Sequence, residues 1–349
     1  MKGIRIGERI IGKGRPCYII AEAGVNHNGD LRLAKKLVKA AAKAGADAVK
    51  FQTFLADSIA TKTAEKAAYQ KRTSDAAETQ YDMLKRLELS RDSFIILSDY
   101  AKKCGIEFLS SPFDLASAEL LESIGVRAYK IPSGELTNIP LLEQTGRYGK
   151  PVILSTGMAD MDEIREGIET LRRGGTKKII LLHCITSYPA PLESANLLMI
   201  PTLEKEFDLP VGFSDHTEGI LASMLARALG ACVIEKHFTL DRNLPGPDHK
   251  ASLEPAELAE LVRQVRLAES ALGDGRKHIG KTEAAIRKIA RKSLVAATAI
   301  PKGTRITRDM VDMKRPGTGI ETKHLKQVVG KRAFRAIKQD TVLRWDMLQ

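Results

Sequence analysis

The chain of 349 residues has few cysteines, a single tryptophan and no long apolar run. Its four cysteines lie far apart and form no Cys-x-x-Cys pair, which argues against a zinc ribbon, a redox motif or a disulfide scaffold. No stretch approaches the roughly 18 consecutive apolar residues that a membrane helix needs. Charges and glycines interrupt the first 16 residues, unlike the apolar region of a signal peptide. We therefore expect a cytoplasmic protein without a membrane partner.

Positive charge is concentrated near the C-terminus. Residues 291–349 hold 14 Lys and Arg against 5 Asp and Glu, and the whole chain has a formal net charge of +12. A basic segment can bind nucleic acid, a membrane surface or an anionic ligand. Here Phe334 and Trp345 are the only aromatic residues available for base stacking, and no zinc or ribonucleoprotein motif is recognisable. We expect no nucleic-acid partner.

Eight short apolar runs alternate with amphipathic segments along most of the chain. Apolar runs separated by helices are typical of a parallel sheet with crossover helices. Eight such units in about 260 residues predict a (β/α)8 barrel, an α/β fold. A doubly wound sheet is the alternative, but no GxGxxG follows the first run. The expected strands are residues 17–22, 47–52, 106–111, 127–133, 151–156, 178–183, 210–215 and 232–237.

An insertion at 54–90 interrupts the alternation of strands and helices, and we expect it to form an active-site loop with one or two helices.

The pattern of the chain changes after Gly273. The last segment shows short strands and turns, and a core of this size is marginal alone. We therefore expect it to dock on the barrel or on another subunit. The predicted parts are a barrel domain at 1–275, a linker at 276–290 and a small β-rich domain at 291–349.

Every predicted strand ends in polar or charged residues. In barrel enzymes the catalytic groups come from the carboxyl ends of several strands, which lie on one face. We therefore expect one polar cavity at that face. The candidate residues are Glu22, Lys50, Gln52, Ser110, Ser111, Lys130, Ser133, Glu135, Ser155, Thr156, His183, Thr186, Tyr188, Ser214, His216, Glu235 and His237.

Two histidines end neighbouring predicted strands. The imidazoles of His216 and His237 can converge on one ion and leave positions for water and substrate oxygens, as a catalytic metal site requires. The carboxylates of Glu22 and Glu235 would suit Mn²⁺ or Fe²⁺ better than a closed zinc site. The alternative is that each histidine only packs against or hydrogen-bonds a neighbour.

Lysines and hydroxyls form a second group of strand-end residues. Lys50 and Lys130, with the hydroxyls of Ser133, Ser155 and Ser214, could together bind a phosphate or a carboxylate. Either lysine could instead form a Schiff base, as in barrel aldolases, or an ordinary ion pair. The hydroxyls favour anion binding.

Nine segments, in order along the chain, carry a resemblance to a known family. They are IIAEAGVNHNGD, VKFQTF, FLSSPFD, YKIPSGE, ILSTGM, LHCITSYPAP, GFSDHTEG, EKHFTLDRNLPGPDHKASLEP and KRPGTGI. The chain resembles the sialic acid synthase family, which includes legionaminic and pseudaminic acid synthases. The resemblance implies a transferase with a (β/α)8 barrel followed by an antifreeze-like (SAF) domain.

The resemblance also implies site roles. His216 and His237 would hold a divalent metal, Mn²⁺ foremost with Mg²⁺ or Co²⁺ as alternatives, which polarises the aldehyde oxygen of an open-chain sugar. C3 of phosphoenolpyruvate would attack the aldehyde carbon, water would add at C2, and phosphate would leave by C–O cleavage. Glu22 would handle that water, and Glu235 would orient the sugar or the metal-bound water. The implied phosphoenolpyruvate ligands are Lys50, Ser110 (or Ser111), Lys130, Ser133, Ser155, Thr186 and Ser214, and the sugar ligands are Gln52, Glu135, Tyr188, Asp248 and Arg315.

Arg315 lies in the implied antifreeze-like domain. In the family this arginine touches the N-acetyl group of the sugar in the partner's active site, which implies a domain-swapped homodimer. The chain departs from the family at two positions. Thr186 stands where many relatives have Asn, and Thr73 takes the place of an Asn that helps to bind sugar. Both departures concern the identity of the sugar.

We therefore expect a metal-dependent synthase that makes N-acetylneuraminate and phosphate from phosphoenolpyruvate and N-acetylmannosamine, an N-acylated aminohexose. The alternative is the same condensation on a 2,4-diacetamido-2,4,6-trideoxyhexose, giving legionaminic or pseudaminic acid. Another alternative is a non-catalytic antifreeze-like interaction protein. Such a protein would have lost the two histidines or the lysines and hydroxyls that could bind an anion, and both groups are present. A Schiff-base aldolase is a further alternative, which borohydride trapping would reveal.

Overall fold

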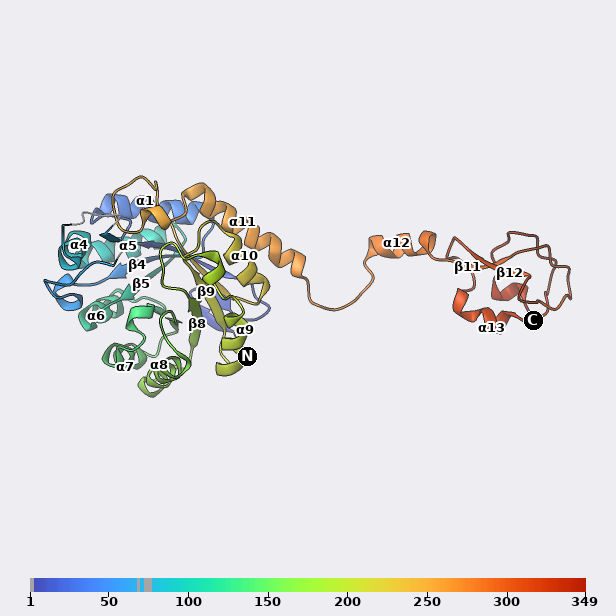
Figure 1. Ribbon diagram of the computed structural model, residues 1–349, viewed down its shortest axis with the longest axis horizontal. Coiled ribbons are helices and arrows are strands. Elements are labelled where there is room, and N and C mark those ends of the chain that lie inside the picture. The colour runs from blue at the N-terminus through green and yellow to red at the C-terminus, as the bar shows by residue number, and fades with distance from the viewer. Residues whose placement is uncertain (1–2, 68–69, 72–76) are drawn as a thin grey trace. The chain divides into compact units, whose positions relative to one another are not determined.

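The computed structural model describes residues 3–67, 70–71 and 77–349. The chain divides into two compact units, Met1–Gly273 and Asp274–Gln349 (Figure 1). Within the described residues, no helix combines the length and apolar character that crossing a membrane demands.

The first unit is an eight-stranded parallel barrel, which confirms the predicted fold. Its strands are β3 (Tyr18–Gly24), β4 (Ala48–Thr53), β5 (Glu107–Pro112), β6 (Tyr129–Ile131), β7 (Val152–Ser155), β8 (Ile179–Cys184), β9 (Val211–Asp215) and β10 (Val233–His237). They follow the order β5-β4-β3-β10-β9-β8-β7-β6, and β5 also lies against β6. Each of the eight predicted apolar runs thus overlaps one strand.

Helices surround the strands, as Figure 1 shows. They are α1 (Leu31–Ala44), α5 (Arg91–Lys103), α6 (Leu115–Ile124), α7 (Ile139–Arg147), α8 (Met161–Gly174), α9 (Met199–Phe207), α10 (Leu221–Ala228) and α11 (Pro255–Leu272). Local signals set their ends: the Asp30 side chain caps α1, which stops at Gly45 with φ of 83°. Their buried faces, including Leu37 and Phe94, join the main core outside the strands.

A short hairpin precedes the barrel and was not expected from the sequence. Strands β1 (Ile4–Ile6) and β2 (Arg9–Ile11) pair antiparallel. Ile4, Ile6 and Ile11 pack in one cluster with Ile153 and Ile180 of the barrel strands. Three-residue strands interrupted by charges give too short a pattern to recognise. The hairpin thereby adds apolar contacts to the interior cluster of the barrel.

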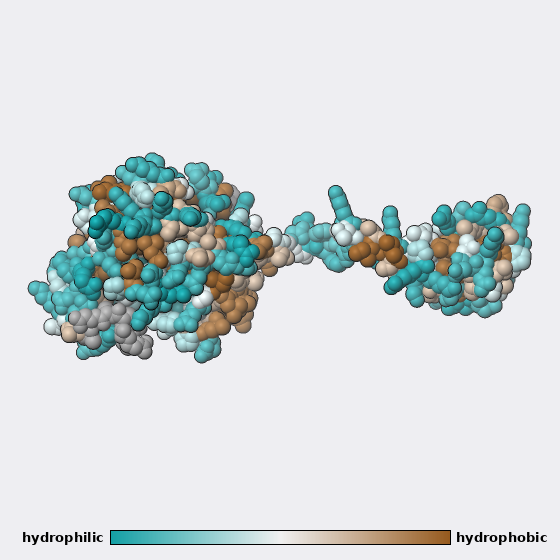
Figure 2. All heavy atoms as spheres, turned by 90° about the horizontal axis from the view of Figure 1, so that it is seen from above, coloured by the Kyte–Doolittle hydropathy of each residue, from teal (hydrophilic) through white to brown (hydrophobic). Residues whose placement is uncertain are grey.

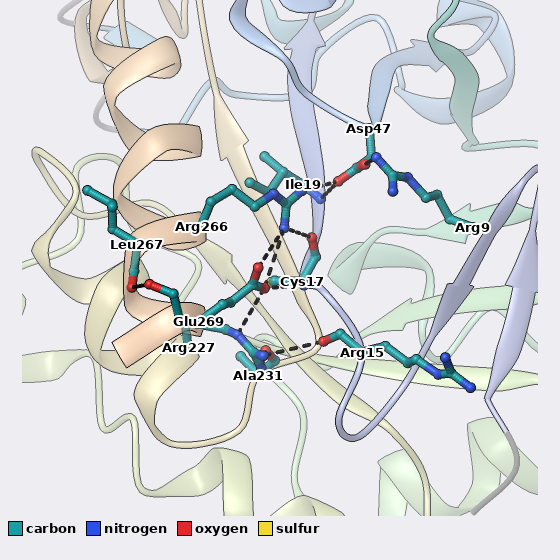
Figure 3. Close-up of polar contacts among 11 residues, drawn as sticks. Arg9, Arg15, Cys17, Ile19, Asp47, Arg227, Ala231, Arg266, Leu267 and Glu269 are labelled. Carbon is teal, nitrogen blue, oxygen red and sulfur yellow. Dashed lines mark hydrogen bonds and ion pairs between the residues drawn. The ribbon is translucent and has the colours of Figure 1, made fainter. Parts of the chain in front are cut away.

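A polar network joins the last barrel helix to the start of the first barrel strand (Figure 3). Asp47 Oδ2 accepts hydrogen bonds from the Ile19 backbone N–H and from Arg266 Nη2, both at 2.9 Å. Arg266 Nη1 also donates to the Cys17 carbonyl at 2.7 Å. The Asp47 side chain is 3% exposed, whereas its ion-pair partners Arg266 and Arg9 are 32% and 61% exposed. The network fixes α11 to the amino end of β3.

The insertion after β4 contains helices α2 (Ala56–Ile59) and α4 (Gln80–Leu87). Thr79 and Asp82 form a reciprocal capping box that starts α4. On the solvent side, Asp57 accepts from Tyr81 Oη at 2.7 Å and from Lys85 Nζ at 3.2 Å, which links the two helices. Thr73, which the sequence analysis singled out, lies outside the described residues.

The second unit has a core of its own, which includes Leu294, Ile306, Val311, Ile320 and Leu343. Its elements are α12 (Lys281–Ala290), β11 (Ser293–Ala296), β12 (Val311–Lys314) and α13 (Leu325–Val328). Strands β11 and β12 pair antiparallel. Helix α12 lies within the segment expected to be a linker.

Helix α12 buries none of its residues. Ile286 is 56% exposed and Ile289 is 70% exposed. Figure 2 shows hydrophobic surface over this segment, whereas most of the visible surface is hydrophilic. The apolar side of α12 is therefore not covered within its own unit.

Candidate active site

A cavity of about 370 Å³ is lined by residues at the carboxyl ends of the barrel strands and by the insertion. Because these strand ends share one face, side chains distant in sequence meet there. Most of the candidate residues named from the sequence line it: Glu22, Lys50, Gln52, Ser111, Lys130, Ser133, Glu135, Thr186, Tyr188, Ser214, His216, Glu235, His237 and Asp248.

Adjacent serines in β5 take opposite directions. Successive side chains of a strand point to opposite faces, so only one of the pair can reach the cavity. Ser111 lines it and accepts a hydrogen bond from Lys50 Nζ at 3.1 Å. Ser110 lies outside the lining and pairs with Thr53 Oγ1 at 2.7 Å. The structure therefore favours Ser111 over Ser110 as an anion ligand.

Four further candidates lie outside the cavity lining, and one of them, Thr156, donates its hydroxyl to the Leu182 carbonyl at 3.0 Å. Ser155 is fully buried in β7, and its Oγ has no hydrogen-bond partner among the described residues. His183 stacks on a phenylalanine ring, and its Nε2 contacts the Ala195 carbonyl at 2.8 Å. Arg315 belongs to the second unit, where its Nε donates to the Ala290 carbonyl at 2.9 Å.

Two lysines and two carboxylates form the charged base of the cavity. Lys50 Nζ lies 2.6 Å from Glu22 Oε2 and 3.7 Å from Glu235 Oε2. Lys130 Nζ lies 3.3 Å from Glu235 Oε1, which also accepts from Ser214 Oγ at 3.0 Å. Both lysines and both carboxylates are buried. The ammonium and carboxylate groups therefore alternate, and all four are shielded from solvent.

The two carboxylates differ in acidity. Burial raises the pKa of Glu22 to about 7, against the opposing effect of the Lys50 ammonium. Burial also acts to raise the pKa of Glu235, but Lys130 and Lys50 outweigh it and hold that pKa below its usual value. Carboxyl groups whose environments separate their pKa values can take different roles at one pH. Glu22 can exchange a proton near neutral pH, whereas Glu235 stays anionic.

His216 and His237 lie side by side at the ends of β9 and β10, with ring centroids 5.3 Å apart. His216 Nδ1 lies 2.8 Å from the Ile185 carbonyl, which in the neutral ring places the proton on Nδ1 and leaves the Nε2 lone pair available. Burial acts to lower the pKa of His216, but the contacts with Cys184 and the Ile185 carbonyl outweigh it and raise that pKa. His237 Nδ1 is buried without a hydrogen-bond partner among the described residues. Burial lowers the pKa of His237 well below its usual value. The neutral imidazole is the form that binds metals.

The donor set fits a divalent cation with open coordination positions. Asp248 Oδ2 lies 3.9 Å from His237 Nδ1, and burial raises the pKa of Asp248 to about 6. Among the described residues, no preformed cluster of three or more His, Cys, Asp or Glu has the geometry of a metal site. The two imidazoles would therefore share the ion with water or substrate oxygens, as in catalytic metal sites.

Models of known families match both units of the chain: the NeuB family model covers residues 37–277, and the SAF domain model covers residues 291–349. The chain belongs to the NeuB family. Several of its relatives are named synthases of legionaminic, pseudaminic or N-acetylneuraminic acids, which confirms the transferase class.

The relatives include named synthases of nearly the same length. The N,N'-diacetyllegionaminic acid synthase of Legionella pneumophila is 48% identical over 342 residues, which cover 97% of this chain and 96% of that protein. The enzyme with the same name from Campylobacter jejuni is 50% identical over 328 residues, covering 93% and 98%. The crystal structure of the N-acetylneuraminic acid (sialic acid) synthetase of Leptospira borgpetersenii, in complex with citrate, has a TM-score of 0.72 and 38% identity, covering 82% of this chain and 95% of that one.

In this NeuB family chain, Gly157 is a site residue that the sequence analysis missed. Its backbone N–H donates to Ser133 Oγ at 2.9 Å. A Cβ at Gly157 would collide with Thr186 and Ser133 and lie tightly against Cys184, and all three residues line the cavity. The glycine directly after the polar end of β7 was the available signal for this close packing.

The sequence analysis also missed an apolar wall on one side of the cavity. We use this name for Val25, Ile59, Met83, Leu84, Leu87 and Phe113, which all line the cavity. Ile59 comes from α2, and the next three come from α4. Apolar residues at helical spacing in an insertion read as ordinary core residues, so the pattern gave no reason to assign them to a site.

Proposed function

We propose that this chain condenses phosphoenolpyruvate with the open-chain form of a 2,4-diacetamido-2,4,6-trideoxyhexose, giving a diacetyllegionaminic acid and phosphate. The observation that carries the choice of sugar is the near full-length identity of 48% and 50% to two N,N'-diacetyllegionaminic acid synthases. Identity to the sialic acid synthetase is lower, at 38%. N-acetylmannosamine, the sugar favoured from the sequence, becomes the second candidate.

The lysines and hydroxyls suit phosphoenolpyruvate. Its phosphate and carboxylate are anions, which Lys50 and Lys130 can pair with, and Ser111, Ser133 and Ser214 can donate hydrogen bonds beside them. Glu22 and Glu235 already form ion pairs with the ammonium groups of these lysines. Bound substrate would therefore share the lysines with these carboxylates and lie close to both of them.

The reaction that we propose forms one carbon–carbon bond and one carbon–oxygen bond from water, and it breaks the carbon–oxygen bond to phosphate. C3 of the enol attacks the aldehyde carbon, and the carbonyl electron pair moves to the aldehyde oxygen, which takes up a proton. Water adds to C2, and phosphate leaves with the electrons of the C2–O bond. Glu22 would remove the proton of that water, because a group with a pKa of about 7 accepts and releases protons near neutral pH.

His216 and His237 would hold the divalent cation, with Mn²⁺ as our first choice and Mg²⁺ or Co²⁺ as alternatives. When bound, such an ion supplies Lewis-acid polarisation of the sugar's aldehyde oxygen. The Ile185 carbonyl keeps His216 in the tautomer that leaves Nε2 available. Tyr188 packs on His216 with ring centroids 4.1 Å apart, which limits rotation of the imidazole.

We further propose that the chain acts as a homodimer in which Arg315 of one subunit reaches the sugar in the other. The exposed apolar residues of α12, Ile286 and Ile289, support an additional contact in the assembly. A mass in solution of about twice 38.3 kDa is expected. A monomer at all concentrations would contradict the dimer.

Phosphate release tests the choice of sugar. The full chain is incubated with phosphoenolpyruvate, Mn²⁺ and either 2,4-diacetamido-2,4,6-trideoxymannose or N-acetylmannosamine. We expect sugar-dependent release that chelator abolishes, with a higher kcat/KM for the trideoxy sugar. A higher kcat/KM for N-acetylmannosamine would instead support the second candidate, and no release with either sugar would refute both.

A further inference from the structure

The lining of the cavity is divided by chemistry. The charged and hydrogen-bonding groups come mainly from the strand ends, whereas the apolar wall comes mainly from the insertion. A reacting sugar must place its aldehyde carbon among the strand-end groups, close to His216, His237 and the lysines. The far end of the open chain, C6, must then lie away from those groups. The apolar wall lines the same cavity, as do Gln70 and Gln80 of the insertion.

The apolar wall is well packed. Val25, Met83 and Leu87 are at most 4% exposed and form one cluster with Phe54. The rings of Phe54 and Phe113 meet edge to face, with centroids 6.2 Å apart. A wall held in this way presents a fixed apolar surface, so a substituent that meets it loses little side-chain entropy from the protein.

Two residues of the wall, Ile59 and Leu84, are only half-buried and still line the cavity. They pack on the edge of the buried cluster from α2 and α4. Their remaining exposed surface is therefore available to a ligand. Leu84 is the more useful probe, because it lies inside α4 and its substitution leaves the helix caps intact.

We propose that the apolar wall, through Ile59 and Leu84, recognises the C6 methyl group of the sugar and selects a 6-deoxy sugar over its 6-hydroxy counterpart. This inference rests on the proposed function and names the residues that determine its specificity. Burying a methyl group against apolar side chains is favourable, whereas a hydroxyl at the same place loses water and gains no hydrogen bond from Ile59 or Leu84. An apolar pocket of this kind discriminates by about 10-fold to 100-fold.

The test uses two sugars that differ only at C6, namely 2,4-diacetamido-2,4,6-trideoxymannose and 2,4-diacetamido-2,4-dideoxymannose. For the unaltered chain we expect kcat/KM to be about 10-fold or more higher with the 6-deoxy sugar. In Leu84→Asn, which keeps the size and adds polarity, this ratio should fall to about 3 or less. The KM for phosphoenolpyruvate should stay the same, because the phosphoenolpyruvate ligands are untouched.

The matched control is Leu120→Asn, a half-buried leucine on α6 that packs on the outer core and does not line the cavity. It should lower stability without changing the ratio. Ile59→Thr is a second test variant in case Leu84→Asn fails to fold. It should also lower the ratio of kcat/KM between the 6-deoxy and the 6-hydroxy sugar.

Two results would overturn the inference while leaving the proposed function intact. One is turnover of both sugars by the unaltered chain at equal kcat/KM. The other is a ratio that Leu84→Asn and Ile59→Thr leave unchanged. Failure of the proposed function looks different, because the unaltered chain would then release no phosphate with any of the sugars.

Discussion

Substituting the buried carboxylate Glu22 should lower activity and raise stability at the same time. Glu22→Gln keeps the shape of the side chain and its contact with Gln52. It removes the group that we assign to proton transfer, so kcat should fall by about 10²-fold to 10⁴-fold. The pH dependence should change too. In the unaltered chain kcat/KM should rise with pH and level off above about 7, and the variant should lose this pH dependence.

The effect on stability follows from proton linkage. Burial raises the pKa of Glu22 in the folded chain from 4.5 to about 7, so the folded state holds a proton that the unfolded state has lost between these values. Folding stability therefore falls as the pH rises through this window. At about 1.4 kcal/mol per pH unit, the difference corresponds to about 3 kcal/mol at pH 8. Glu22→Gln mimics the protonated form and should recover up to this amount.

The assay compares urea unfolding of the two chains at pH 4.5 and pH 8, together with initial rates of phosphate release. The stabilisation should be present at pH 8 and vanish near pH 4.5. Glu166→Gln, on the exposed face of α8, is the matched control and should alter neither property. A Glu22→Gln variant that retains the rate and the pH profile of the unaltered chain would refute the assignment of Glu22.

Other predictions concern the metal, the helix network and the tail domain. His216→Ala and His237→Ala should each lower the affinity for Mn²⁺ in calorimetry and lower turnover by more than about 10²-fold. If one of these variants keeps turnover that chelator abolishes, the substituted histidine is not a ligand of the metal. Asp47→Ala should lower the free energy of unfolding by about 2–4 kcal/mol, because a backbone N–H and an arginine lose a buried partner. Glu206→Ala, which breaks an exposed pair, should cost less than about 1 kcal/mol; equal losses would contradict this account. Arg315→Ala should raise the KM of the sugar more than that of phosphoenolpyruvate, and an unchanged sugar KM would argue against its proposed role.

The barrel was predictable because its strands are buried on both faces. In the run 178–183, residues 179–182 are continuously apolar and His183 follows them, which marks both the strand and the end that carries the site. His216 and His237 were expected to lie together because they end consecutive strands, and parallel neighbours bring such ends to one edge. Chain order and periodicity were sufficient for these predictions.

Other features depended on information that the pattern does not contain. Ser110 and Ser111 are adjacent, and only the phase of β5 decides which one faces Lys50. The apolar wall follows from the way α4 packs against the loop after β3, which is a tertiary contact. The hairpin of β1 and β2 is too short for a recognisable period. From its helical spacing alone, Leu84 is indistinguishable from an ordinary core residue, and only the structure shows that it lines the cavity.

Sugar-dependent cleavage of the C–O bond of phosphoenolpyruvate is the central claim, and an isotope label tests it most directly. Phosphoenolpyruvate carrying ¹⁸O in the bridge between C2 and phosphorus is turned over with 2,4-diacetamido-2,4,6-trideoxymannose and Mn²⁺, and the released phosphate is examined by mass spectrometry. The account predicts that phosphate appears only when the sugar is present and that it carries the label. Unlabelled phosphate, or release that does not depend on the sugar, would contradict it.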